Sequence, residues 1–206
     1  MGEVLRSEAG LAVPIGTVCD AGEQRGAPRF TLLIRAAKLI TPVGEYMCVV
    51  RDASETGVNV RLFHQLPDCG KMLLELQNGD QHELELVWQD HDRAGLRFCG
   101  PVNISRIVES PSRFAKRPVR IRLNHAGVLS ATQENVACTI QDISQQGAKV
   151  ISDHRFSIDQ RVKLAAAGLP EVNTKVRWRR DDMYGLVFED TFQFGDLARI
   201  VDRVQQ

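Results

Sequence analysis

The 206-residue sequence lacks an excess of either charge, because 26 lysines and arginines balance 26 aspartates and glutamates. It is also poor in aromatic residues, which make up 6% of the chain. A small barrel that binds nucleic acid polymers typically has net positive charge and aromatic side chains between its basic residues. Neither feature marks this composition, so we expect no nucleic acid polymer as a partner and rank that function last.

Long apolar runs are missing as well. The longest, such as TLLIRAAKLI at 31–40, are broken by charge well short of the ~18 residues that indicate a membrane span. The first 16 residues include Glu3, Arg6 and Glu8, and they contain no continuous apolar stretch of the kind that a secretory signal needs. We therefore expect a cytoplasmic protein with no membrane span.

The sequence also has few of the patterns that enzymes and metal sites need. Its cysteines are odd in number, widely scattered and without a Cys-x-x-Cys pair, which indicates reduced thiols rather than disulfides or zinc ligands. No histidine has metal-ligand spacing, and no catalytic triad order or phosphate-binding glycine loop is present. We expect no enzymatic activity, no metal and no cofactor. The cysteines are Cys19, Cys48, Cys69, Cys99 and Cys138.

Most of the chain is a repeat with a lag close to 90 residues. ELVWQDHDRAGLRF at 85–98 aligns with KVRWRRDDMYGLVF at 175–188, and RDASETGVNV at 51–60 aligns with QDISQQGAKV at 141–150. A sustained repeat of this kind indicates duplicated structural units. We predict a flexible leader at 1–21, a first domain at 22–108 and a second domain at 109–206.

Within each copy, apolar residues alternate with polar ones, as in half-buried antiparallel strands. QNGD at 77–80 is a tight-turn sequence, and AGLPE at 167–171 occupies the matching place in the second copy. Short strands separated by such turns predict a mainly β chain with a small barrel or sandwich in each half. Helical spacing in FGDLARIVDRVQQ at 194–206 predicts a closing helix, and 99–112 predicts a shorter one.

Two further positions are assigned to structure rather than to chemistry. Trp88 and Trp178 fall within alternating strands, and we predict that both anchor the cores. His91 stands between two aspartates at the tip of a predicted hairpin, where charged residues are expected to be solvated.

Two paired motifs carry the candidate chemistry. Arg25 and Arg29 in the first copy, like Arg113 and Arg117 in the second, have a spacing that places two guanidinium groups on one side of a helix or strand. Two such groups can bind phosphate oxygens and stack on flat rings. The second motif, Asp-x-Ser-x-x-Gly, offers a carboxylate that can accept hydrogen bonds from the N1 and N2 edge of guanine. Its residues are Asp52, Ser54 and Gly57 in the first copy, and Asp142, Ser144 and Gly147 in the second.

Together these motifs resemble the PilZ domain, the bacterial receptor module for cyclic di-GMP. The family is defined by an R-x-x-x-R arm followed by [D/N]-x-S-x-x-G, and both appear twice here, with the late W…G-[LV]-x-F pattern. The resemblance implies a six-stranded β-barrel followed by a helix in each half. It also implies that the four arm arginines hold phosphates and guanine faces, that the aspartates and serines contact guanine, and that the glycines shape the turn.

We therefore expect a cyclic di-GMP receptor of bacterial origin, in which ligand binding orders the arm, changes the placement of the two domains and signals to an unidentified protein target. The second set of site residues is favoured, because its arm lies at the domain junction. One alternative is a protein-interaction scaffold in which one or both domains do not bind ligand, and Asp-x-Ser and Gly merely form a turn.

Overall fold

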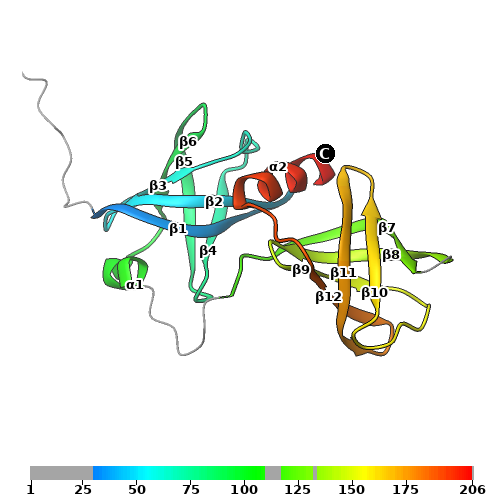
Figure 1. Ribbon diagram of the computed structural model, residues 1–206. Helices are drawn as coiled ribbons and strands as arrows, with labels where there is room; N and C mark the ends of the chain where they lie inside the picture. The colour runs from blue at the N-terminus through cyan, green and yellow to red at the C-terminus, as the bar shows by residue number, and fades with distance from the viewer. Residues whose placement is uncertain (1–29, 110–116, 132–133, 206) are drawn as a thin grey trace, which may run out of the picture.

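The computed structural model describes residues 30–109, 117–131 and 134–205, and only the backbone of residues 30–33. Two closed antiparallel β-barrels follow one another along the chain, and a helix follows the last strand of each (Figure 1). The expected fold class, mainly β with two six-stranded barrels in tandem, is confirmed.

The first barrel has the strand order β1-β2-β3-β6-β5-β4 and closes through pairing of β4 with β1. Closure pairs every strand on both sides, so the barrel has no open edge. Its elements are β1 (Phe30–Thr41), β2 (Gly44–Ala53), β3 (Gly57–Arg61), β4 (Lys71–Leu76), β5 (Gln81–Asp90), β6 (Arg93–Phe98) and α1 (Ile104–Glu109).

The second barrel repeats this order strand for strand, as β7-β8-β9-β12-β11-β10, and closes through pairing of β10 with β7. The sequence repeat is therefore a repeat of topology. Its elements are β7 (Ile121–Ala131), β8 (Glu134–Ser144), β9 (Gly147–Ile151), β10 (Arg161–Ala166), β11 (Leu169–Arg180), β12 (Met183–Phe188) and α2 (Phe194–Gln205).

The predicted turns and helices are where the sequence placed them. Gly79 joins β4 to β5 and Gly168 joins β10 to β11, with φ angles of 89° and 75° that favour glycine. His91 is exposed in the turn between β5 and β6, as expected for a solvated hairpin tip. α2 presents Leu197, Ala198, Ile200 and Val201 to the core at helical spacing.

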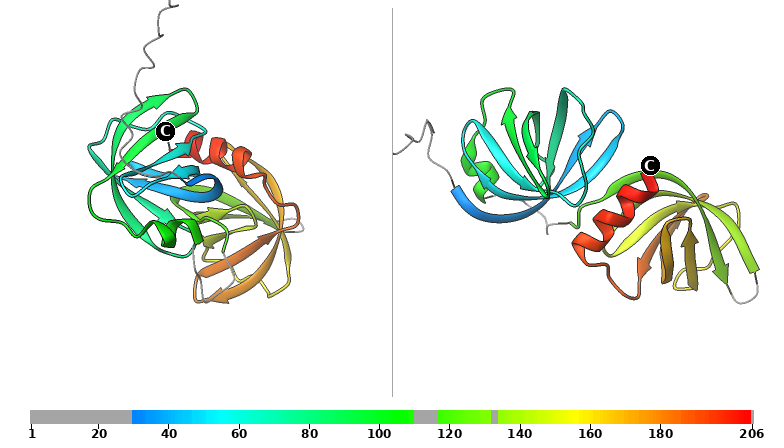
Figure 2. Two further views of the ribbon diagram at one scale, coloured as in Figure 1. Left: turned by 90° about the vertical axis from the view of Figure 1, so that its left-hand side faces the viewer. Right: turned by 90° about the horizontal axis from the view of Figure 1, so that it is seen from above.

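α2 lies between the two barrels and packs against both (Figure 2). Its apolar face belongs to the core of the second barrel, and this core also includes Met47 from β2 of the first barrel. Phe63 packs against the same core and meets Phe194 edge to face, with ring centroids 5.7 Å apart. The contact between the barrels is therefore partly an extension of the second core.

The prediction that Trp88 and Trp178 anchor the cores is wrong, because 44% and 43% of their surfaces are exposed. The cause is a β-bulge in each strand. Leu86 pairs with Leu96, but Trp88 pairs with Gly95, so two residues of β5 advance against one of β6. A bulge reverses which side of the strand faces the core. The same shift lies between Val176 and Trp178 in β11.

Four of the cysteines, Cys48, Cys69, Cys99 and Cys138, are free thiols, and Cys19 lies outside the described residues, as does the predicted leader at 1–21. Across the described ranges, no group of three or more potential ligands could hold a metal ion. None of the helices in those ranges is long and apolar enough to span a bilayer.

Candidate ligand-binding site

The arginine arms fall largely outside the described residues. Arg25, Arg29 and Arg113 are not described, whereas Arg117 is exposed in the segment that leads into β7. The backbone carbonyl oxygen of Arg117 accepts a hydrogen bond from the Gln77 side-chain amide at 3.2 Å. The second arm therefore ends against the β4–β5 turn of the first barrel.

The Asp-x-Ser-x-x-Gly motif forms the turn between β8 and β9. Ser144 is 1% exposed, and its hydroxyl donates to the carbonyl oxygen of Gly147 at 3.1 Å. A Cβ atom on Gly147 would overlap the carbonyl oxygen of Leu186 on β12, so this position requires glycine. The hydroxyl would have to leave the turn to reach a ligand.

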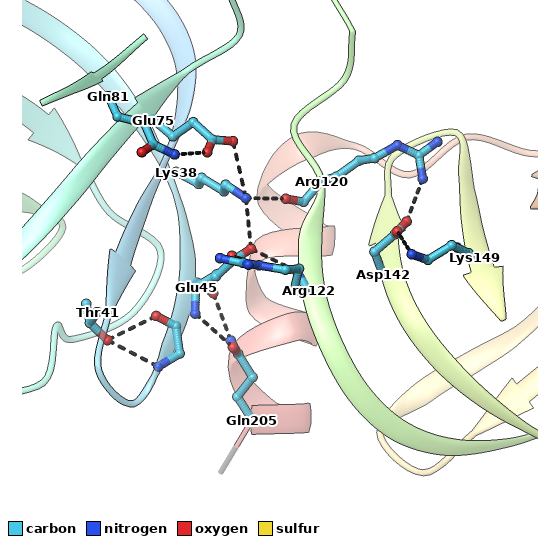
Figure 3. A network of polar contacts seen from close by, with 11 residues as sticks. Lys38, Thr41, Glu45, Glu75, Gln81, Arg120, Arg122, Asp142, Lys149 and Gln205 are labelled. Carbon is cyan, nitrogen blue, oxygen red and sulfur yellow. Dashed lines mark hydrogen bonds and ion pairs between the residues drawn. The ribbon is translucent and has the colours of Figure 1, made fainter. Parts of the chain in front are cut away.

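The carboxylate of Asp142 has two cationic partners (Figure 3). Arg120 Nη1 lies 2.6 Å from Oδ1, and Lys149 Nζ lies 3.6 Å from Oδ2. The Asp142 side chain is 15% exposed. This corner of the barrel has two positive groups against one negative group, and a phosphate would meet a positive surplus there.

Four residues lie in a row across neighbouring strands of the second barrel. Asp142 pairs with Lys149, Lys149 with Gly185, and Gly185 with Trp178. We call these four residues the second-barrel row. Because neighbouring strands are about 4.8 Å apart, the backbone of the row covers about 14 Å, measured along the curved sheet from β8 to β11. A carboxylate, an ammonium and an aromatic side chain thus lie on consecutive or neighbouring strands of one barrel.

The first barrel has the same row with one change. Asp52 pairs with Asn59, Asn59 with Gly95, and Gly95 with Trp88. These residues, the first-barrel row, line an open pocket of about 590 Å³ together with Ser54, Thr56, Gly57, Val58, Val87, Leu96 and Arg97.

The two rows differ in charge at their second position. Lys149 in the second barrel is replaced by Asn59 in the first, so the ammonium that faces the aspartate is lost. In the first barrel Ser54 also bonds its own turn, donating from its hydroxyl to the carbonyl oxygen of Gly57 at 3.3 Å. An anion therefore meets a more positive row on the second barrel.

Sequence reasoning identified the aspartates, serines and glycines of the motif but missed Trp178 and Lys149. Trp178 was assigned to the core because the bulge that exposes it is not visible in the alternation of residues. The lag of 90 that aligns Trp88 with Trp178, each seven residues before a glycine, was the available signal. An indole covering the same glycine on two copies indicates a shared surface feature.

Comparison with protein families settles what the second barrel is. The PilZ domain family matches residues 111–206. The second barrel is a PilZ domain. The first barrel repeats the strand order, the Asp-x-Ser-x-x-Gly turn and the row of this PilZ domain. The predicted resemblance to a tandem PilZ-domain protein is thus confirmed. No curated protein was found to match the chain.

Several solved structures are similar to the chain with low sequence identity and low TM-scores, among them the following three. One is Borreliella burgdorferi PlzA in complex with c-di-GMP, with 11% identity, coverage of 84% of this chain and 89% of that one, and a TM-score of 0.35. Another is Bacillus subtilis inhibitor of motility MotI, with 12% identity, coverage of 83% of this chain and 94% of that one, and a TM-score of 0.37. The third is Escherichia coli YcgR in complex with c-di-GMP, with 11% identity, coverage of 83% of this chain and 82% of that one, and a TM-score of 0.32.

Proposed function

We propose that the protein is a non-enzymatic cyclic di-GMP receptor whose main site is the second-barrel row. The observation that carries this proposal is the alignment of carboxylate, ammonium and exposed indole on a PilZ domain. Cyclic di-GMP has two guanine bases and two phosphates, so it needs groups that bind base edges, base faces and anions at once. The row offers all three.

Each group has a distinct role in the proposed complex. The Asp142 carboxylate accepts hydrogen bonds from the N1 and N2 edge of one guanine. Trp178 provides a flat surface for base stacking. Lys149, Arg120 and the arm arginines neutralise the phosphates, and guanidinium forks do so bidentately.

The remaining motif residues of the second barrel support this arrangement. Arg113 and Arg117 form the arm that closes over the ligand, and Ser144 and Gly147 hold the turn that presents Asp142. In the first barrel, Arg25, Arg29, Asp52, Ser54 and Gly57 form a second site of the same design. We expect it to bind more weakly, because Asn59 replaces the lysine of the row.

The proposed signal is a change in the placement of the two domains, 22–108 and 109–206, which a protein target in the cytoplasm then recognises. Its physical basis is the position of the arm, whose last residue already touches the first barrel through Gln77. Ordering the arm over a ligand would change the contacts at this junction.

Isothermal titration calorimetry of cyclic di-GMP into the full chain tests the proposal. The variants are Arg113→Ala/Arg117→Ala, Arg25→Ala/Arg29→Ala and Asp142→Ala. A matched control, Arg155→Ala/Arg203→Ala, removes the same charge from exposed positions elsewhere in the second half. We expect affinity to fall with added salt, because the ligand is anionic.

The outcomes separate the sites. Loss of heat in the Arg113/Arg117 and Asp142 variants, with the control unchanged, supports the second-barrel site. Loss confined to the Arg25/Arg29 variant places the working site on the first barrel. No heat from folded wild-type protein overturns the proposal and favours a protein-interaction scaffold.

A further inference from the structure

A buried ion pair lies on the side of the first barrel that faces the second (Figure 3). Lys38 on β1 and Glu45 on β2 are 7% and 5% exposed, and Lys38 Nζ lies 3.0 Å from Glu45 Oε2. Glu75 Oε1 lies 3.3 Å from the same ammonium. Buried charges are costly unless each has good partners, so their further bonds are informative.

Those bonds reach into the second barrel. Lys38 Nζ donates to the backbone carbonyl oxygen of Arg120 at 3.1 Å. The backbone N–H of Arg122 donates to Glu45 Oε2 at 2.9 Å, and the Arg122 guanidinium donates to Glu45 Oε1. The Lys38–Glu45 pair therefore forms hydrogen bonds with the main chain on both sides of Ile121, at the start of β7.

The segment that these bonds fix, Arg120 to Arg122, is next to the proposed ligand site. The guanidinium of Arg120 bonds the carboxylate of Asp142 at 2.6 Å, and Arg122 is the partner of Asp142 in the β7–β8 ladder. Arg120 thus connects the two barrels. Its backbone carbonyl oxygen accepts a hydrogen bond from Lys38 of the first barrel, and its side chain bonds Asp142, the first member of the second-barrel row.

Glu45 is itself fixed from a third direction. Its backbone N–H donates to Gln205 Oε1 at 3.0 Å, and Gln205 Nε2 donates to the carbonyl oxygen of Glu45 at 2.9 Å. Gln205 belongs to α2, which packs in the core of the second barrel. The second barrel therefore bonds the backbone of Glu45, whose side chain in turn bonds β7. This reciprocal arrangement limits how far the carboxylate can move relative to the row.

We infer that Glu45 of the first barrel is a positioning residue for the ligand site of the second barrel, acting through Arg122 and Arg120 on Asp142. This inference rests on the proposed cyclic di-GMP function. Without the carboxylate, Lys38 and Arg122 lose a shared partner, and the start of β7 can move away from Asp142. By linkage, a ligand that orders Arg120 also strengthens the contact between the barrels.

The test compares Glu45→Gln with Glu75→Gln in the full chain. Both variants remove one carboxylate next to Lys38, but only Glu45 bonds the second barrel among the contacts that the structure describes. We expect Glu45→Gln to weaken cyclic di-GMP binding about tenfold, which is a typical coupling between sites. Glu75→Gln should stay within about twofold, because the bonds of Glu45 to Lys38 and to the Arg122 backbone remain in place.

A second variant guards against a folding defect. The Arg122 side chain is 72% exposed, so Arg122→Ala should fold normally. We expect Arg122→Ala to weaken binding less than Glu45→Gln does, because the Arg122 backbone N–H still donates to Glu45. The double variant should lose little more than Glu45→Gln alone, because the Arg122 guanidinium acts through Glu45. Exchange of the Arg122 amide hydrogen, measured by NMR, should be faster in Glu45→Gln than in Glu75→Gln.

Three results would overturn the inference, and they differ in whether the proposed receptor function also falls. Equal affinity of wild type and Glu45→Gln overturns the positioning role alone and leaves the receptor function in place. No binding by wild type overturns the proposed function, and the positioning role with it. Equal losses in Glu45→Gln and Glu75→Gln would show a general charge effect and would also overturn the inference.

Discussion

Trp178 and Gly185 face each other across the β11–β12 ladder, and the indole occupies the space where a side chain at 185 would begin. Aromatic and glycine partners of this kind shield the glycine backbone while leaving the outer ring face accessible. The bulge at Val176 to Trp178 is what places the indole on the outside of the barrel.

Removing the indole should impair binding far more than folding. We expect Trp178→Ala to weaken cyclic di-GMP binding by about 1–3 kcal/mol, the usual contribution of one stacked base. The loss in stability should be about 1 kcal/mol or less, as for one cross-strand pair. Calorimetric titration and urea unfolding measure the two effects.

The chain contains two tryptophans, so fluorescence can assign the binding barrel. In Trp88→Phe the remaining indole reports on the second barrel, and in Trp178→Phe it reports on the first. We expect cyclic di-GMP to change the emission of Trp88→Phe at lower ligand concentration. A response confined to Trp178→Phe would contradict the preference for the second barrel.

Gly147 should tolerate no side chain. A Cβ there would overlap the carbonyl oxygen of Leu186, and backbone atoms cannot move aside cheaply. We expect Gly147→Ala to lower the free energy of unfolding by about 1–3 kcal/mol. The control is Gly100→Ala, where a Cβ meets nothing within 4 Å. Equal stability of the two variants in urea would show that the turn can relax.

The contact between the barrels should weaken in acid. Burial of Glu45 opposes its ionisation, but hydrogen bonds from Arg122 and Lys38 outweigh this effect, and the pKa of Glu45 lies below its ordinary value of 4.5. A lowered pKa contributes stability that is present above the unfolded value and is lost as pH falls through the folded value. Glu45→Gln cannot show this loss.

Unfolding of wild type and Glu45→Gln in urea at several pH values between about 6 and 3 measures this contribution. We expect the stability difference between the two proteins to be largest at the upper end and to shrink towards the lower end. A difference that stays constant over this range would show that ionised Glu45 contributes nothing specific.

The closing helix should be essential to the second barrel. Leu197 is 0% exposed and lies in the core of that barrel. We expect Leu197→Ala to cost about 2–5 kcal/mol, as for other large-to-small changes in cores. Arg203→Ala, at an exposed position of the same helix, should cost about 0.5 kcal/mol or less. Thermal unfolding compares them, and similar melting temperatures would exclude a structural role for the buried face.

Much of the fold could be predicted because its signals are local. Turn residues such as Asn78 and Gly79 favour one backbone conformation, and the helical spacing at 194–206 needs no distant partner to be recognised. The repeat then showed that whatever one half forms, the other forms too. The motif residues Asp142, Ser144 and Gly147 were identifiable for the same reason, since they lie within six residues.

The orientation of Trp178 could not be predicted from alternation. A bulge adds one residue to one strand of a pair, and whether it is present depends on the register of the neighbouring strand. Lys149 was overlooked because its contact with Asp142 depends on the register between β8 and β9. Its position beside Gly185 depends in turn on the register between β9 and β12.

The sequence by itself determined a mainly β chain in two repeated halves, with their turns, their closing helices and the paired motifs, because each of these signals depends on residues close together in the chain. Six strands and a barrel in each half were implied by the family resemblance. Only the tertiary structure decided that Arg122 bonds Glu45, 77 positions away, and that Met47 joins the core of the other barrel. Such contacts depend on how two finished barrels meet. The surfaces that meet are made of side chains brought together by closure of each barrel, and no local pattern records them.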